Sequence, residues 1–159
     1  MRYYMKSKFF KIKEDFWIKN DHGEDVYFVD NKFLSFGLQF EISRNNRVLY
    51  SVKEKLLTFM SNYEMFEQGN VVAHINQKFA FFRDRINVSS KYGDLNIQGD
   101  YFDYNYEIYK DEMLIAKVTK EFLSFTDNYY IDVDFEDEAF VLALVVIIDN
   151  IIDKQKDNN

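Results

Sequence analysis

Alternation of apolar and polar residues is the dominant pattern of this chain. Short runs have a period of two, as where Val48, Tyr50 and Val52 alternate with the intervening residues. That period turns one face of an extended strand towards a core and the other towards water. The runs are separated by short polar segments such as SRNN, EQGN and YKDE, which are typical of hairpin turns. The pattern therefore predicts a series of antiparallel hairpins.

The predicted hairpins are copies of one another. Residues 40–59, 63–82 and 106–125 align without gaps, at offsets of 23 and then 43 residues. With the weaker copies included, the starts fall at residues 16, 40, 63, 86, 106 and 129, and a leading half copy spans Met5–Ile12. Five full copies and two halves predict about twelve strands, and so many twisted strands tend to close into a barrel. We therefore expect an all-β fold, an antiparallel β-barrel of about twelve strands.

A different pattern begins near the C-terminus. Several carboxylates are followed by ten uninterrupted apolar residues, Ala139–Ile148, and acids before an apolar run mark the start of a helix. A helix that is apolar on all sides is buried, and this one is shorter than the roughly 20 apolar residues of a membrane span. We expect this C-terminal helix to fill the barrel, no transmembrane segment, one domain over residues 1–154, and a frayed tail over residues 155–159.

Composition narrows the classes of function. The 159 residues include no cysteine and carry a net charge of −7, which excludes disulfides, thiolate zinc sites and cysteine nucleophiles. An acidic chain has no general attraction for nucleic acid. The sequence contains no nucleophile elbow, Walker loop or dinucleotide fingerprint. It lacks the continuous apolar stretch of a signal peptide at its start. We expect a cytoplasmic protein that binds no cofactor and is not an enzyme. The alternative, an enzyme or small-molecule binder, would need an open cavity beside the helix.

Basic residues crowd the N-terminal segment. They are Arg2, Lys6, Lys8, Lys11 and Lys13. A cluster of this kind suits the headgroups of anionic lipids or other phosphates. The alternative is an outer strand face on which lysines resist edge-to-edge pairing.

Acidic residues crowd the segment before the predicted helix. The candidates for a calcium site are Asp127, Asp132, Asp134, Glu136 and Asp137. They supply the hard oxygen ligands that calcium prefers, although they do not follow the EF-hand spacing. The alternative is that they are outward-facing strand residues and acids that favour the helix start.

The combination of segments resembles a known family. IDVDFEDE followed by AFVLALVVIIDNIID, behind hairpins that end in KFLSF, KLLTF, KFAFF and EFLSF, resembles the LURP-one-related family, and most closely its YxjI-like bacterial members. The resemblance covers essentially the whole chain. It implies a twelve-stranded barrel around a central hydrophobic helix, the fold type of tubby C-terminal domains and phospholipid scramblases.

A resemblance in fold does not transfer an activity. A filled barrel leaves only its outside for binding, so we expect a non-enzymatic domain of protein interaction or scaffolding, with an unknown partner. The alternative is peripheral binding to phospholipid membranes through the basic N-terminal segment, with calcium as a candidate modulator.

Overall fold

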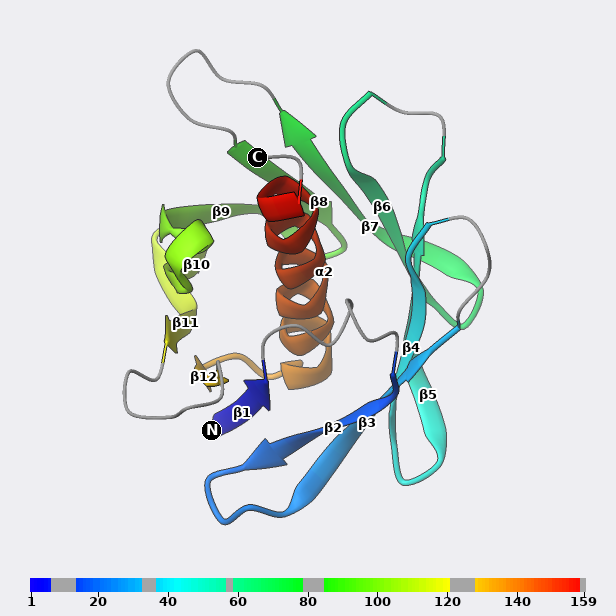
Figure 1. Ribbon diagram of the computed structural model, residues 1–159, viewed down its shortest axis with the longest axis vertical. Helices are drawn as coiled ribbons and strands as arrows, with labels where there is room; N and C mark the ends of the chain where they lie inside the picture. The colour runs from blue at the N-terminus through cyan, green and yellow to red at the C-terminus, as the bar shows by residue number, and fades with distance from the viewer. Residues whose placement is uncertain (7–13, 33–36, 57–58, 79–84, 121–127, 158–159) are drawn as a thin grey trace.

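The chain forms a closed antiparallel β-barrel with one long helix inside it (Figure 1). The computed structural model describes residues 1–6, 14–32, 37–56, 59–78, 85–120 and 128–157. Each strand pairs with its neighbours in sequence, and β1 pairs with both β2 and β12, which closes the barrel. The strands are β1 (Arg2–Lys6), β2 (Phe16–Asn20), β3 (Asp25–Asn31), β4 (Gln39–Arg44), β5 (Arg47–Glu54), β6 (Asn62–Glu67), β7 (Asn70–Lys78), β8 (Arg85–Ser90), β9 (Gly93–Asp100), β10 (Asn105–Lys110), β11 (Met113–Lys120) and β12 (Asn128–Val133).

The predicted twelve-stranded barrel and its helix are confirmed. Each of the six predicted copy starts falls on the first or second residue of an observed strand, namely β2, β4, β6, β8, β10 and β12. The leading strand was placed too late, because β1 begins at Arg2 rather than at Met5. The remainder of that predicted strand, from residue 7 onwards, lies outside the described residues.

Four of the five hairpins carry a β-bulge at the same point of the repeat. The pairing steps over Leu49 in β5, Val72 in β7 and Ile115 in β11, and these three residues are equivalent in the aligned copies. Val26 of β3 is bypassed in the same way. A bulge inserts one residue and re-aims the side chains beyond it. The predicted inward alternation is therefore wrong at Val48, which is exposed.

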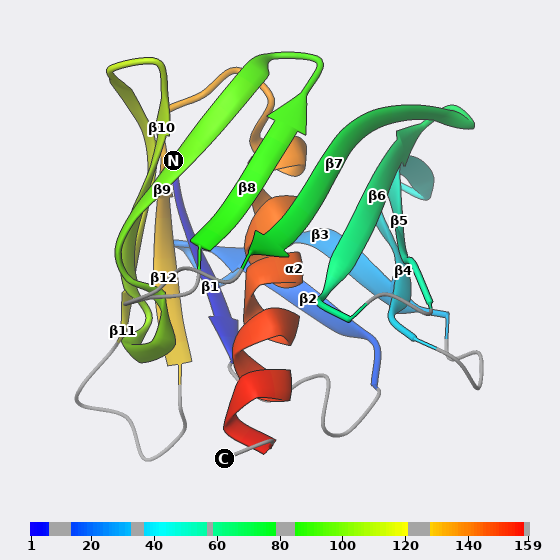
Figure 2. The same ribbon diagram turned by 90° about the horizontal axis from the view of Figure 1, so that it is seen from above.

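The tight hairpin turns lie at the end of the barrel where the helix begins (Figure 2). Asn45 and Asn46, like Gln68 and Gly69, have positive φ angles, which two-residue turns of type I′ require. We call this end, made of residues 19–25, 44–47, 67–70, 90–94, 110–113 and 132–138, the turn rim.

The helix α2 (Glu138–Asp157) runs along the inside of the barrel from the turn rim to the opposite end (Figures 1 and 2). Every side chain from Phe140 to Ile148 is fully buried. The wall encloses the helix on all sides, which explains why its first three turns have no polar face. α2 continues to Asp157, so residues 155–157 are helical. Whether residues 155–159 fray stays a prediction.

Candidate functional site

The start of α2 is held by tyrosines that reach it from the barrel wall. Asp137, directly before the helix, accepts hydrogen bonds on Oδ2 from the hydroxyls of Tyr50 and Tyr92, the second at 2.6 Å. Its Oδ1 accepts the amide N–H of Phe140 at 3.1 Å, which caps the first turn. One carboxylate therefore joins β5, the β8–β9 turn and the helix.

A second carboxylate makes a similar connection to two other strands. Glu138 accepts the hydroxyl of Tyr3 from β1 at 2.5 Å and that of Tyr27 from β3 at 3.4 Å. Burial raises the pKa of both phenols, the hydrogen bond to Glu138 raises that of Tyr3 further, and the charge of Glu138 raises that of Tyr27. Both hydroxyls therefore stay protonated and act as donors near neutral pH. We call Tyr3, Tyr27, Tyr50 and Tyr92 the tyrosine collar.

A lysine contacts the tyrosine collar and one of the carboxylates that the collar binds. The ammonium of Lys91 donates to the Tyr50 hydroxyl and to Glu67, each at 2.9 Å, and lies 3.6 Å from Asp137. Burial lowers the pKa of Lys91, but the hydrogen bonds with Tyr50 and Glu67 outweigh it and leave the pKa raised. Lys91 therefore stays charged and balances Asp137.

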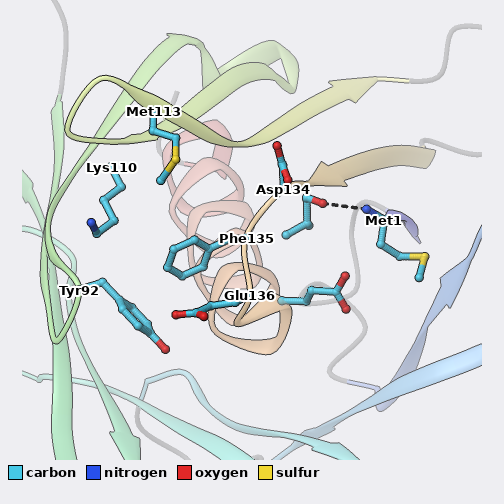
Figure 3. A pocket seen from close by; sticks show the side chains of 9 residues that line it. Met1, Tyr92, Lys110, Met113, Asp134, Phe135 and Glu136 are labelled. Atoms are coloured by element: carbon cyan, nitrogen blue, oxygen red, sulfur yellow. Dashed lines mark hydrogen bonds between the residues drawn. The ribbon is translucent and has the colours of Figure 1, made fainter.

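Two open depressions lie beside the helix start and share Tyr92, Glu136 and Glu138. The first has a volume of about 700 Å³, and its other lining residues are Met1, Lys110, Met113, Val133, Asp134 and Phe135. Figure 3 shows Tyr92, Lys110 and Met113 on one side of Phe135, and Met1 and Asp134 on the other. The second has a volume of about 680 Å³, and the rest of its lining is Tyr27, Arg44, Asn45, Arg47, Leu49, Asp137 and Ala139.

Two carboxylates of this region have no side-chain partner among the described residues. Asp134 and Glu136 are exposed, and their side chains make no hydrogen bond or ion pair with the described part of the chain. Phe135 between them packs edge-on against Tyr92, with ring centroids 4.9 Å apart. The first depression thus places two free negative charges around an aromatic side chain.

Acidic residues outnumber basic ones around the turn rim. Its exposed or partly exposed acids include Asp21, Glu24, Asp25, Glu67, Asp94, Asp111, Glu112, Asp134 and Glu136, and its cations are Lys19, Arg44, Arg47, Lys91 and Lys110. Exposed apolar side chains lie next to the turns, at Val48, Val71, Met113 and Leu114. The rim therefore combines negative charge with apolar surface.

The calcium candidates do not converge within the described residues. Asp132 is bound by the guanidinium of Arg2 at 2.7 and 2.8 Å, and this hydrogen bonding lowers the pKa of Asp132. Asp137 is bound by two tyrosines of the collar, whereas the side chains of Asp134 and Glu136 contact no charged or hydrogen-bonding partner among the described residues. No group of three or more potential metal ligands forms among the residues that the structure describes. Asp127 lies outside them, so a calcium site that includes it stays a prediction.

The basic candidates are placed only in part. Arg2 pairs with Asp132 and stacks over the ring of Tyr130 at 4.2 Å, so it supports the outer wall. Lys6 ends β1, but its side chain is not described. Lys8, Lys11 and Lys13 lie outside the described residues. The predicted lipid-binding patch is therefore untested.

The sequence analysis did not predict the tyrosine collar, although the repeat contains a signal for part of it. Tyr27 and Tyr50 occupy the repeat position that holds Ala73 and Ala116 in two other copies. All four side chains are buried. A large polar residue in place of alanine marks the two hairpins whose hydroxyls reach the helix start.

Comparison with known proteins identifies relatives of the whole chain. The family model described as "LURP-one-related" matches residues 1–149. The uncharacterized protein YxjI of Bacillus subtilis is 23% identical over 158 residues, 98% of this chain and 96% of the relative. An X-ray structure of an Arabidopsis thaliana protein has the same fold, with a TM-score of 0.67, 16% identity, and coverage of 94% of this chain and 91% of the other. Among the described helices, none has the length and apolarity needed to cross a membrane.

Proposed function

Since this chain belongs to the LURP-one-related family and fills its own barrel with a helix, we propose that it is a non-enzymatic protein-interaction domain that binds through the turn rim. The observation that carries this proposal is the complete burial of α2 from Phe140 to Ile148. Barrels that hold a ligand keep an open interior, and here that volume is occupied by side chains. The depressions beside the helix start then become the natural contact surface.

The chemistry of the rim favours a basic partner. Its carboxylates exceed its cations, and Asp134 and Glu136 have no partner of their own among the described residues. Complementary charge steers association and selects the partner. The nearby apolar residues Val48, Val71 and Leu114 supply the area that such a contact needs to bury. We infer that the partner presents lysine or arginine side chains around an apolar centre.

The state of the collar supports a binding role rather than catalysis. Each of its four hydroxyls donates to a carboxylate, and burial raises the pKa of each phenol. A nucleophile needs a base that activates it, whereas these carboxylates are already tied to several donors. The cysteine-free composition accords with a cytoplasmic location.

Site-specific photo-crosslinking in cells tests the proposal. A photoreactive residue in place of Glu136 should give discrete protein adducts, whereas one in place of Lys117, on the outer wall at β11, should not. Reversing the charge at the neighbouring site with Asp134→Lys should weaken the adducts, because a basic partner is then repelled. Equal adduct formation at both positions would contradict binding through the rim.

Membrane binding is the alternative that a separate measurement distinguishes. If the basic N-terminal segment binds lipid, the protein should sediment with vesicles of anionic phospholipid at low salt and be released as salt is added. A melting temperature that rises on addition of calcium would indicate the modulation expected from the acidic segment. Absence of sedimentation at low salt would remove this alternative.

A further inference from the structure

The far half of α2 contains a buried carboxyl group that forms no well-aligned hydrogen bond with the described residues. Asp149 is 1% exposed, and neither of its side-chain oxygens has a hydrogen-bond partner in the part of the chain that the structure describes. An ionised carboxylate in such a place is strongly disfavoured, and the group usually takes up a proton instead.

Among the described residues, the groups around Asp149 do not fully compensate a negative charge. On α2 itself, Asp153 lies one turn further on and is also buried. The wall contributes three buried tyrosines, Tyr104 after the 3₁₀ turn η1 (Tyr101–Asp103), Tyr106 on β10 and Tyr129 on β12. Burial raises the pKa of each tyrosine, and the charge of Asp149 raises it further. They therefore stay neutral and supply no charge.

The cation that favours ionisation of Asp149 among the described residues stands at the surface. Lys156 is exposed and lies over the ring of Tyr104, 5.1 Å from its centroid. Its charge and the hydroxyl of Tyr104 favour ionisation of Asp149, but burial and the charge of Asp153 outweigh them and raise the pKa of Asp149 to about 8. Divalent ions such as calcium are usually held by several carboxylates, and the described residues include no group of three or more His, Cys, Asp or Glu side chains that could hold a metal ion.

We propose that Asp149 is a proton-binding site that couples the seating of the last two turns of α2 to pH. With the proton bound, the neutral carboxyl packs among the tyrosines and the helix end stays in the barrel. Without it, a buried negative charge stands beside Asp153, the Tyr104 hydroxyl and the exposed Lys156 do not offset its burial, and residues 149–157 separate from β10 and β12. The first turns of α2 stay in place, because Asp137 and Glu138 remain bound by the collar.

The sign of the effect follows from proton linkage. In the unfolded chain Asp149 titrates near an aspartate's usual pKa of about 3.9, well below its raised value in the fold. Between these values the folded state holds one more proton than the unfolded state, so stability falls as pH rises and levels off above about pH 8.

Unfolding equilibria between pH 5 and 9 test the coupling. The wild-type folding equilibrium constant should fall about tenfold per pH unit between pH 5 and 7, the slope for one linked proton. Asp149→Asn should remove this slope, whereas Asp134→Asn, an exposed and unpaired control, should keep it. An unchanged slope in Asp149→Asn would overturn the proposal. So would stabilisation of the wild type alone by potassium or calcium, which would make Asp149 a cation ligand.

Two measurements locate the effect. Hydrogen exchange, corrected for intrinsic rates, should show that residues 149–157 lose protection from pH 6 to 8.5 while residues 140–148 keep it. Joint loss of protection by both halves would refute the local seating. Carboxyl ¹³C shifts of the wild type give the titration directly, even if Asp149→Asn does not fold. A midpoint above pH 7 is expected, and one below pH 5 would overturn the assignment.

Discussion

Removal of one buried hydrogen bond should reveal how the helix is fixed in the barrel. The hydroxyl of Tyr63, on β6, donates to Oδ1 of Asn150 at 2.7 Å. Tyr63 is fully buried, and Asn150 is 7% exposed. We predict that Tyr63→Phe destabilises the protein, because it takes away a bond and leaves a buried carbonyl oxygen without its donor.

The expected cost comes from these two contributions. A net hydrogen bond is worth about 1 kcal/mol, and an unsatisfied buried acceptor adds about 1 kcal/mol or more. We therefore expect Tyr63→Phe to lower the free energy of unfolding by about 2 kcal/mol. In a domain of this size that lowers the melting temperature by about 4 to 8 °C. Asn150→Leu alone should cost less. It also leaves the Tyr63 hydroxyl without its acceptor, but the apolar contacts of the new leucine offset part of that loss.

A double-mutant cycle isolates the bond. Urea unfolding of Tyr63→Phe, Asn150→Leu and the combination should show that the double variant loses at least about 1 kcal/mol less than the sum of the singles, because no polar atom is then orphaned. Tyr109→Phe is a matched control, since its hydroxyl bonds Glu107 on the outer surface. It should change stability by no more than about 0.5 kcal/mol. Additive losses would refute the claim that this bond holds the helix.

Three further changes probe other parts of the fold. Leu144→Asp places an unpaired charge in the fully buried helix and should abolish cooperative folding by near-UV circular dichroism, whereas Val48→Asp on the exposed wall should not. Gly99→Ala should cost more than Gly69→Ala in thermal unfolding. Both glycines have positive φ, but only at residue 99 does a new Cβ come within 2.7 Å of a backbone oxygen. Asp132 has a lowered pKa because of its hydrogen bond to an arginine, so it stabilises the fold above about pH 3.9 and less as pH falls. Asp132→Asn should therefore cost less than about 1 kcal/mol at pH 7 for this half-exposed pair, and the difference should vanish in acid.

The periodicity of the sequence was sufficient to predict the barrel because each hairpin is local. Alternation and turn chemistry are properties of neighbouring residues, and the copy starts therefore coincide with observed strand starts. Alternation failed at Val48 because a bulge shifts the pairing of β5. The repeat itself contained that information, since apolar residues stand side by side at Val48 and Leu49 and again at Val71 and Val72.

The candidate site was harder to predict because it joins distant parts of the chain. The hydroxyls that hold Asp137 and Glu138 come from strands and turns separated from them by 45 to 135 residues. Alternation within a strand does not encode such a meeting, and only comparison of the repeat copies sets Tyr27 and Tyr50 apart. The burial of Asp149 depends on how deep the barrel is around α2, which the apolar run alone does not determine. From the sequence alone, Asp149 and Asp153 can be recognised only as the residues that end this run.

The two ends of α2 are stabilised unequally, and this has consequences for function. At the turn rim Asp137 and Glu138 each accept two tyrosine hydroxyls, and Lys91 also lies 3.6 Å from Asp137, so both carboxylates have hydrogen-bond donors. At the other end Asp149 forms no well-aligned hydrogen bond with the described residues. A region held by few stabilising contacts opens with a lower free energy than the whole fold needs to unfold. Opening should therefore begin at the C-terminal end of α2, while the proposed partner surface at the turn rim keeps its shape. An Asp137→Asn variant should reverse this order by weakening the collar, and hydrogen exchange over residues 138–148 then reports the change.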